Sequence, residues 1–409
     1  MVTKPPVSRT IQATTGNNRE HIRRHNLSAI LRLLSQSGSM PRSALTQRTG
    51  LNRSTISDLV AELVELGLVV EAESTTTQGV GRPSLMVSPT EDVVAFSVHP
   101  DIDAITVGVV TFSGQVIHKI RQVTPVQPAA TAAAEVANDL INTLRARLPA
   151  HTRIAGIGVA IPGQVRHTDG VVRLAPHLNW IEVPFARMLN QLTSLPVFID
   201  NDASLGSIAE RDFGAGRGFK EIVYLFGGSG GIGGGVIHDG QPLRGAAGYA
   251  GELGHVRISD SIAEDYSGLS GTQESQVSRE TLLAALKLTG VDDDELRVAL
   301  ANDPSPKVRK VAEAQIDALA IAIGNFVNIF NPEIILLAGY LSVLYAFDTD
   351  RLLSRFRWSS LTASQDRLIL RPAELGANLL MVGAAQMSFA RVIQEPATIT
   401  LIPARAPKK

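Results

Sequence analysis

The stretch from Gly248 to Glu274 holds residues whose types and spacing could do chemistry. It reads GYAGELGHVRISDSIAEDYSGLSGTQE and places Glu252 and His255 three residues apart, soon after a glycine-rich segment at 227–235. Carboxylate and imidazole groups donate and accept hydrogen bonds, which suits them to a ligand with hydroxyl groups. Asp265 and His255 could also hold a metal through one oxygen and one nitrogen, whereas the Ser and Thr hydroxyls nearby are poor zinc ligands.

A second candidate lies where a predicted strand ends. The segment Pro196–Asp200 reads as a strand that delivers Asn201 and Asp202 at its C-terminal end. In α/β proteins, ligands bind beyond the carboxyl ends of strands. A carboxylate there can accept a proton from a hydroxyl within hydrogen-bond reach. Strand and helix patterns alternate after Pro89, which predicts an α/β protein.

From about Val93 to Ala390 the chain resembles the ROK family of sugar kinases and sugar-responsive repressors. In that family a Glu-x-Gly-His turn precedes a Cys-x-Cys-Gly-x-x-Gly-Cys-x-Glu segment, and residues 265–274 keep its glycines and final Glu. The resemblance implies a two-lobed α/β fold of the actin and sugar-kinase (ribonuclease H-like) type. It also implies a sugar site formed by six residues: Gly163, Asn201, Asp202, Glu252, His255 and Glu274.

The metal site of that family is absent from this sequence. In the family, the His of the turn and three Cys hold a structural zinc, but this chain has no Cys and has Asp265, Ser267 and Thr272 at the three positions. Structural zinc sites use four Cys or His ligands. We therefore expect no metal, and a loop held by hydrogen bonds among these three side chains. His177 is a further departure, because the family usually has Asn there.

The nucleotide side departs from the kinase pattern at three places. Family kinases have Asp-x-Gly-Gly-Thr in the first hairpin, where this chain has His99 and Asp101 on either side of a proline. A carboxylate there repels a triphosphate. Gly230 replaces a phosphate-contacting Thr, and Tyr340 is expected to crowd a nucleotide. We therefore expect no ATP cofactor and no catalysis, with Asp202 as a relic base. The alternative is an active, ATP-dependent sugar kinase that carries a DNA-binding domain.

The N-terminal residues have the charge and pattern of a DNA-binding domain. Residues 1–57 contain nine Lys or Arg and one acid, and three short helical patterns precede two strands. This order is typical of a winged helix-turn-helix, whose second helix reads the major groove from its N-terminal end. A Gly-Arg-Pro stretch between the strands is typical of a wing that enters the minor groove, although a plain hairpin turn also fits it. The residues predicted to contact DNA are Arg42, Asn52, Arg53, Ser54, Thr55, Ser57 and Arg82.

The chain is too long for a single core, and its composition changes predict four segments. We expect a flexible basic arm at 1–25, a winged helix-turn-helix at 26–89, a kinase-like domain at 90–395 and a disordered tail at 396–409. Within the kinase-like domain we expect one lobe at 90–200 with 379–395 and another at 201–378.

The remaining composition limits the partners and the compartment. The absence of Cys excludes disulfides and thiol chemistry. The lack of an apolar run of about 18 residues and of a signal-peptide core favours the cytoplasm and no membrane. A net charge of −1 gives no global attraction to DNA, so binding must depend on a local patch. We expect a homodimer or tetramer that binds a double-stranded operator and a sugar effector. A third alternative, from another functional class, is a protein-binding scaffold.

Overall fold

The computed structural model describes residues 19–73, 85–124, 126–166, 168–228 and 230–405. The chain divides into two compact units. One unit, called the N-terminal unit here, comprises the chain up to Pro89 together with Val392–Ile399. The other, called the pocket unit, comprises Thr90–Arg391 and the residues from Thr400 onwards.

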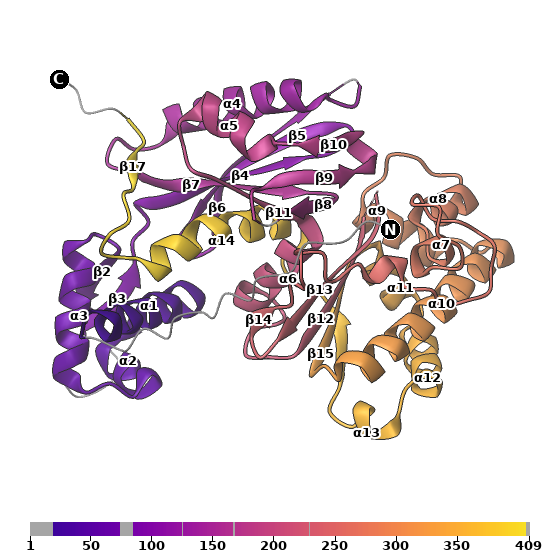
Figure 1. The fold of residues 1–409 in the computed structure, drawn as a ribbon. Coiled ribbons are helices and arrows are strands. Elements are labelled where there is room, and N and C mark those ends of the chain that lie inside the picture. The colour runs from indigo at the N-terminus through magenta and orange to yellow at the C-terminus, as the bar shows by residue number, and fades with distance from the viewer. Residues whose placement is uncertain (1–18, 74–84, 125, 167, 229, 406–409) are drawn as a thin grey trace, which may run out of the picture. The chain divides into compact units, whose positions relative to one another are not determined.

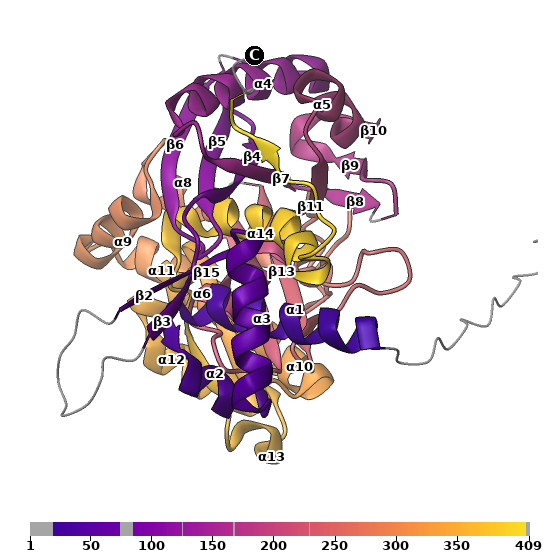
Figure 2. The same cartoon turned by 90° about the vertical axis from the view of Figure 1, so that its left-hand side faces the viewer.

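The N-terminal unit combines three helices with a three-stranded antiparallel sheet (Figures 1 and 2). Its helices are α1 (Arg19–Ser37), α2 (Arg42–Thr49) and α3 (Arg53–Glu65). Its strands, in sheet order, are β1 (Met40–Pro41), β3 (Leu85–Pro89) and β2 (Val69–Glu73). Apolar residues three or four positions apart bury one face of α1 and α3: Leu27, Ile30, Leu31, Leu34, Ile56, Leu59, Val60 and Leu63.

A tight turn joins α2 to α3. Gly50 follows α2 with a φ of 72°, a conformation that glycine adopts without steric cost. Asn52 then caps α3, because its side-chain oxygen accepts a hydrogen bond from the Thr55 amide at 2.9 Å. The predicted helix-turn-helix is therefore present, with the first turn of α3 held by its own cap. The loop at 74–84, which contains the predicted wing, lies outside the described residues.

The predicted flexible arm is wrong for residues 19–25, because α1 begins at Arg19. These residues are polar helix formers without an apolar stripe, so periodicity alone gave no signal of a helix. Arg23 forms an ion pair with Glu62 of α3 at 2.8 Å, which ties this end of α1 to the domain. The rest of the predicted arm, residues 1–18, lies outside the described part of the chain.

The predicted disordered tail is wrong for residues 396–405. β17 (Ile402–Pro403) pairs antiparallel with a central strand of the pocket unit, and Ala404 is buried. Arg145 donates hydrogen bonds to the carbonyls of Pro403 and Ala404. A two-residue strand among Pro and Ala leaves almost no periodic signal in the sequence, so composition misled the prediction.

The first sheet of the pocket unit has the order β11-β7-β4-β5-β6. Its strands are β4 (Val93–Pro100), β5 (Ala104–Thr111), β6 (Val116–Val123), β7 (Arg153–Ile161) and β11 (Val197–Asn201). Figure 1 shows α4 (Ala130–Arg147) and α5 (Phe185–Thr193) over one face of this sheet. A small antiparallel sheet beside it contains β8 (Gln164–Arg166), β9 (Val171–Ala175) and β10 (Trp180–Val183), with the 3-10 turn η1 (Pro176–Leu178) between the last two.

The second sheet has the order β14-β13-β12-β15-β16. Its strands are β12 (Ile222–Gly228), β13 (Gly231–His238), β14 (Gln241–Pro242), β15 (Ile334–Gly339) and β16 (Ile369–Pro372). The helices around it are α7 (Gln273–Gln276), α8 (Arg279–Leu286), α9 (Asp293–Asn302), α10 (Pro306–Phe330), α11 (Tyr340–Phe347), α12 (Thr349–Ser359) and α13 (Thr362–Gln365). Two short 3-10 turns, η2 (Leu253–His255) and η3 (Gly376–Asn378), complete this part.

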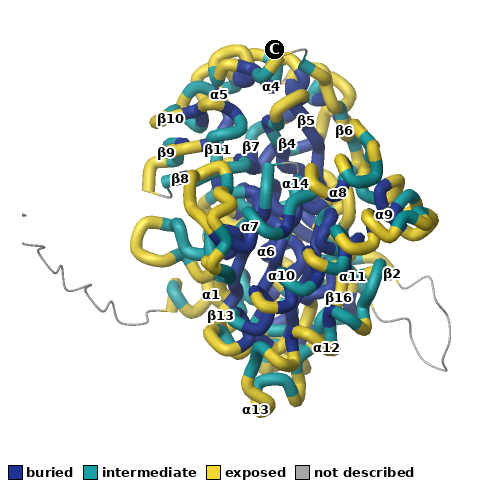
Figure 3. The backbone as a smooth tube through the Cα atoms, turned by 90° about the vertical axis from the view of Figure 1, so that its right-hand side faces the viewer, coloured by how far each residue is buried: buried dark blue, intermediate teal, exposed yellow. Residues whose placement is uncertain are grey.

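Two helices, α6 (Asp202–Phe213) and α14 (Leu379–Gln394), pack with both sheets in one apolar cluster. Gly158 of β7 makes this packing possible, because a Cβ there would lie 1.8 Å from the backbone oxygen of Ala384 on α14. Figure 3 shows the buried strands of the first sheet in dark blue, and β5 is buried along its whole length. In the described residues, no helix is long and apolar enough to cross a membrane.

Candidate functional site

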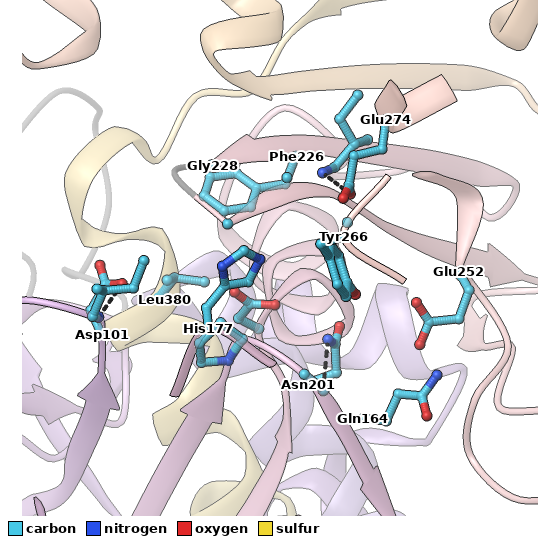
Figure 4. A pocket seen from close by; sticks show the side chains of 18 of the residues that line it. Asp101, Gln164, His177, Asn201, Phe226, Gly228, Glu252, Tyr266, Glu274 and Leu380 are labelled. Carbon is cyan, nitrogen blue, oxygen red and sulfur yellow. Dashed lines mark hydrogen bonds between the residues drawn. The ribbon is translucent and has the colours of Figure 1, made fainter. Parts of the chain in front are cut away.

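A cavity of about 110 Å³ in the pocket unit brings together all six residues of the predicted sugar site. They reach it from different elements: the β7–β8 turn, the β11–α6 junction, η2 and α7. Figure 4 shows the carboxylates of Glu252 and Glu274 and the amide of Asn201 around Tyr266. Sequence reasoning thus selected residues that converge in space, from positions as far apart as 163 and 274.

The β11–α6 junction holds Asn201 and Asp202 at the end of a strand and the start of a helix. The Asn201 side-chain oxygen caps α6 by accepting from the Ser204 amide at 2.9 Å, and its Nδ2 donates to the Gly163 carbonyl at 3.1 Å. Asp202 is only 9% exposed, and its Oδ1 accepts from the Ala203 amide at 2.7 Å. Because the cap fixes the first turn of α6, both side chains have a defined direction.

Three carboxyl groups of this cavity hold protons more tightly than usual. Burial raises the pKa of Asp202 to about 6, although the nearby His99 opposes that rise. Burial also raises the pKa of Glu274 to about 7, against a hydrogen bond from the Ile232 amide. The pKa of Glu252 is raised by burial as well, with His255 acting in the opposite sense. Carboxyl oxygens accept hydrogen bonds, and the side-chain amides of Asn201 and Gln164 in the same cavity also donate them, which suits a polyhydroxyl ligand.

Glu274 reaches the cavity because a glycine makes room for it. Its Oε2 accepts a hydrogen bond from the Ile232 amide at 2.7 Å. A Cβ at the neighbouring Gly231 would lie 2.2 Å from that oxygen, and Gly231 has a φ of +115°. Only glycine fits both the space and the backbone conformation. Gly231 of the glycine-rich segment therefore provides the space that the Glu274 carboxylate occupies.

The carboxylate of Asp265 connects several residues of the segment 255–272 through hydrogen bonds. Its Oδ2 accepts hydrogen bonds from His255 Nδ1 at 2.8 Å and Thr272 Oγ1 at 2.9 Å. Its Oδ1 accepts from Ser267 Oγ at 2.6 Å and from the Ser267 and Leu269 amides. Burial alone would raise the pKa of Asp265, but these hydrogen bonds outweigh burial and hold the pKa well below its usual range. The loop expected from the sequence is therefore held by hydrogen bonds, as predicted.

Tyr266 is a cavity residue that sequence reasoning missed. Its hydroxyl lies 3.1 Å from His255 Nε2, and its ring packs edge-on against the rings of His255 and His177 at 5.2 Å and 5.0 Å. Among the residues that the structure describes, the buried Nε2 atom of His177 has no hydrogen-bond partner. Gln164, Phe226 and Leu380 also line the cavity. Only the position of Tyr266 within the motif at 265–274 could have indicated that it lines the cavity. For Gln164, the indication was that it directly follows Gly163.

The nucleotide-side departures fall into two groups. His99, Asp101 and Gly230 line the cavity, and His99 Nδ1 donates to the Ala160 carbonyl at 3.0 Å. Tyr340 does not crowd a ligand, so that expectation was wrong: it is fully buried in the core of the second sheet and donates to the Val277 carbonyl. As the first residue of α11, it turns inward, and Gly227 leaves room for its ring.

A second cavity of about 730 Å³ adjoins the first and shares His99, Phe226 and Leu380 with it. Three consecutive acids, Asp292–Asp294, lie on its wall together with Lys119. In the described part of the chain, no group of three or more His, Cys, Asp or Glu side chains is arranged to hold a metal ion.

The predicted DNA-contacting residues divide by their surroundings. Asn52, Arg53 and Ser54 are exposed at the start of α3, and Thr55 is partly exposed beside them. Arg42 instead pairs with Glu71 at 2.5 Å and donates to Ser57 Oγ at 2.8 Å, so these two predicted contacts are occupied within the domain. Arg82 lies outside the described residues.

Comparison with known proteins adds two domain matches. The model of the ROK family matches residues 102–390. The model of the IclR helix-turn-helix domain matches residues 26–73. The two matches fall on the pocket unit and the N-terminal unit, respectively.

Individual relatives include repressors and kinases. The chain is 28% identical to a xylose repressor of Caldicellulosiruptor bescii over 93% of this chain and 99% of that protein. It is 33% identical to a glucokinase of Thermotoga maritima, over 46% of this chain and 64% of that protein. Among solved structures, a ROK family transcriptional regulator described as a homologue of Escherichia coli Mlc matches with a TM-score of 0.75 and 24% identity, over 91% of this chain and 98% of that one.

Proposed function

This chain belongs to the ROK family, and from that premise we propose that it is a DNA-binding transcriptional repressor whose pocket unit senses a sugar. One observation carries the proposal. A helix-turn-helix with an exposed polar start of α3 is joined in one chain to a cavity where six predicted sugar-site residues meet. Repressors of this kind are also among the relatives that match along almost the whole chain.

The proposed effector is a small polyhydroxyl compound, and the chemistry of the cavity supports this class. Asp202, Glu252 and Glu274 line the cavity together with the Asn201 and Gln164 amides, so acceptors and donors both face a ligand with hydroxyl groups. The same cluster of acids disfavours a phosphorylated or carboxylated effector, because like charges repel strongly at short range in a partly buried site. The xylose repressor of Caldicellulosiruptor bescii matches along 93% of this chain, and its name puts xylose first in a panel of neutral sugars.

A thermal-shift screen with neutral pentoses, hexoses and their phosphates tests the effector. A ligand that binds only the folded state raises stability by about 2.7 kcal/mol at a hundredfold excess over its Kd. Glu252→Gln is the matched variant, because it keeps the size of the side chain and removes its charge. We expect one neutral sugar to raise the melting temperature of the wild type and to lose that effect in the variant. A panel without any response would contradict the sugar assignment.

For the DNA side, we propose an operator with two half-sites bound by a homodimer or tetramer. Helix-turn-helix dimers place their recognition helices about 34 Å apart, one turn of DNA. Asn52, Arg53 and Ser54 are the residues proposed to meet base edges, because they are exposed at the N-terminal end of α3. Selection from random DNA identifies the operator sequence and shows whether it is palindromic. Sedimentation velocity with the selected fragment then measures how many protein chains bind it.

Sugar and operator are proposed to act on each other through the protein. Sugar-kinase folds close around their ligands by domain motion, and any change in operator affinity must be matched by the same change in sugar affinity. We expect sugar to weaken operator binding by about 5- to 150-fold. Operator titrations at fixed salt, with and without sugar, measure this factor. Equal operator affinities with sugar shown to be bound would contradict the coupling.

An active sugar kinase is the second candidate function, and two observations favour it. Over the part that it covers, the glucokinase is 33% identical to this chain, compared with 28% for the xylose repressor. A cavity large enough for a further ligand also adjoins the sugar site. Against it, His99 and Asp101 stand where a phosphate-binding hairpin is expected, and an acid there repels a triphosphate. ATP turnover with the same sugar panel separates the two candidates. Turnover that disappears in Asp202→Asn would establish the kinase.

A further inference from the structure

The carboxylate of Asp265 is the most heavily hydrogen-bonded acidic group around the cavity. Its side chain is fully shielded from solvent, yet Asp265 forms no ion pair with Lys or Arg among the described residues. Instead it accepts five hydrogen bonds, three from side chains and two from backbone amides. A buried carboxylate without a cation is costly unless such bonds compensate for it. The five donors gathered around the Asp265 carboxylate therefore indicate a specific structural role for this residue.

A turn motif accounts for the hydrogen bonds to only one of the two carboxylate oxygens. The bonds from Ser267 and Leu269 to Oδ1 are local and resemble an ordinary Asx turn. The bonds to Oδ2 are different, because they come from His255, ten residues earlier, and Thr272, seven residues later. Asp265 therefore ties η2 to the start of α7, two elements that line the cavity.

A structural zinc does not fit these residues. The donors at the four positions are one imidazole, one carboxylate and two hydroxyls, and hydroxyls of Ser and Thr are poor zinc ligands. Both hydroxyls also direct their hydrogens at Asp265, so their donor bonds, and not metal bonds, hold the group together. The carboxylate occupies the centre of its own donors and leaves His255 Nδ1 with a hydrogen where a metal would need a bare nitrogen.

The bond to Nδ1 defines how His255 faces the cavity. Because a carboxylate only accepts, Nδ1 must carry a hydrogen, and Nε2 then points toward the Tyr266 hydroxyl at 3.1 Å. Tyr266 is held in turn by that bond and by the edges of two imidazole rings. Each step fixes the next side chain, from the shielded carboxylate to an aromatic ring that lines the cavity and is 45% exposed.

We propose that Asp265 is a metal-free positioning residue that fixes His255 and Tyr266 as part of the ligand site. In this arrangement Nε2 of His255 accepts a hydrogen bond from the Tyr266 hydroxyl. The Tyr266 oxygen accepts hydrogen bonds from hydroxyl groups of the ligand, and the Tyr266 ring lies against the ligand's C–H face. The ligand part of this inference rests on the proposed sugar-binding function. The positioning part concerns only the protein and holds without any ligand.

The first experiment measures the protonation of His255 in the protein without ligand. Long-range ¹H–¹⁵N correlation spectra of the full-length chain report which imidazole nitrogen carries a hydrogen, and His255→Gln assigns the signal among nine histidines. We expect a protonated Nδ1 on His255, unchanged by added zinc or by a chelator. A bare Nδ1, or one that loses its hydrogen to stoichiometric zinc, would overturn the proposal. No altered chain other than the assignment variant is needed for this reading.

The second experiment removes the acceptor. Asp265→Asn replaces one acceptor oxygen by an amide donor that faces other donors, and Asp260→Asn is the control because Asp260 lies in the same loop with a fully exposed side chain. We expect Asp265→Asn to lose the defined His255 signal and to lower affinity for the effector by about 10- to 100-fold. We expect Asp260→Asn to leave both unchanged. An intact signal and intact affinity in Asp265→Asn would refute the positioning role.

The two measurements separate failure of this inference from failure of the proposed function. If no sugar binds, but Nδ1 is protonated and Asp265→Asn alters the His255 signal, the positioning role holds and the effector class is wrong. If a sugar binds equally well to the wild type and to Asp265→Asn, the sugar-binding function holds and the positioning role is wrong. Tyr266→Phe, which retains the ring and loses the hydroxyl, should weaken the effector less than Tyr266→Ala; equal losses would remove the ring from the proposed contact.

Discussion

Two buried aspartates at the β11–α6 junction should respond in opposite ways to the same substitution. Asp200 is 2% exposed and has a partner, because it forms an ion pair with Arg244 and accepts a hydrogen bond from the Asn201 amide. Asp202 is 9% exposed, and burial raises its pKa to about 6. We expect Asp202→Asn to stabilise the protein at high pH, and Asp200→Asn to destabilise it.

The sign and size for Asp202 follow from its pKa. A carboxyl with a raised pKa binds protons more tightly in the folded state than in the unfolded state. Its contribution to the free energy of unfolding therefore falls as the pH rises from about 4, near its ordinary pKa of 3.8, through about 6. The difference corresponds to at most about 3 kcal/mol, at 1.36 kcal/mol for each pKa unit. Because Asn can still accept the Ala203 amide bond, we expect a gain of about 1–3 kcal/mol at pH 8 and almost none near pH 4.

Urea unfolding of the full-length chain without ligand, at about pH 4 and pH 8, measures this difference. Asp200→Asn leaves the Arg244 guanidinium without its charged acceptor, so a loss of about 1–3 kcal/mol is expected. If Asp202→Asn instead lost stability at pH 8, or gained equally at both pH values, the burial argument would be refuted. A confirmed gain would mean that Asp202 is kept at a cost in stability, as expected of a group selected for binding.

Four further changes test other parts of the structure. Arg53→Ala should weaken operator binding by about 1–3 kcal/mol if the side chain contacts a base, with an unchanged melting temperature, because Arg53 is exposed. Arg42→Ala should instead lower the melting temperature, because Glu71 loses its partner; a pure loss of DNA affinity would show that the ion pair is dispensable. His177→Asn should change the ratio of affinities between two sugars of the panel, since the buried Nε2 of His177 has no partner in the described part of the chain; an unchanged ratio would exclude His177 from selectivity. Gly231→Ala should abolish sugar-induced stabilisation and cost about 1–3 kcal/mol, because its Cβ would displace the Glu274 carboxylate; a neutral result by calorimetry would contradict the local geometry.

The sequence predicted the parts of the fold that depend on periodic burial and on motif spacing. The α/β class and the helix-turn-helix are confirmed, because each has a local signal of its own. The meeting of six motif residues in one cavity followed from the resemblance, since strand ends and glycine turns bring distant segments together. Their role as ligands of a sugar stays a prediction.

What the sequence did not predict depends on side-chain direction and on long-range pairing. Tyr340 was expected near a nucleotide, but whether the first residue of a helix faces a cleft or a core is decided by tertiary packing. Tyr266 lies in an irregular loop, where no period indicates which side chains line a cavity. β17 needed a partner 248 positions earlier, as in the pair Ile402 and Ile154, and two residues are too few for a pattern.

The membership of Val392–Ile399 in the N-terminal unit has a consequence for the biosynthesis of the protein. A ribosome makes the helix-turn-helix first, but the last piece of that unit emerges only after Thr90–Arg391 of the pocket unit have been translated. Until then Arg24 of α1 lacks Glu395, its partner at 2.8 Å. A chain that ends before Val392 thus carries an incomplete DNA-binding unit, and the completed unit occurs only together with a pocket unit translated at least as far as Arg391.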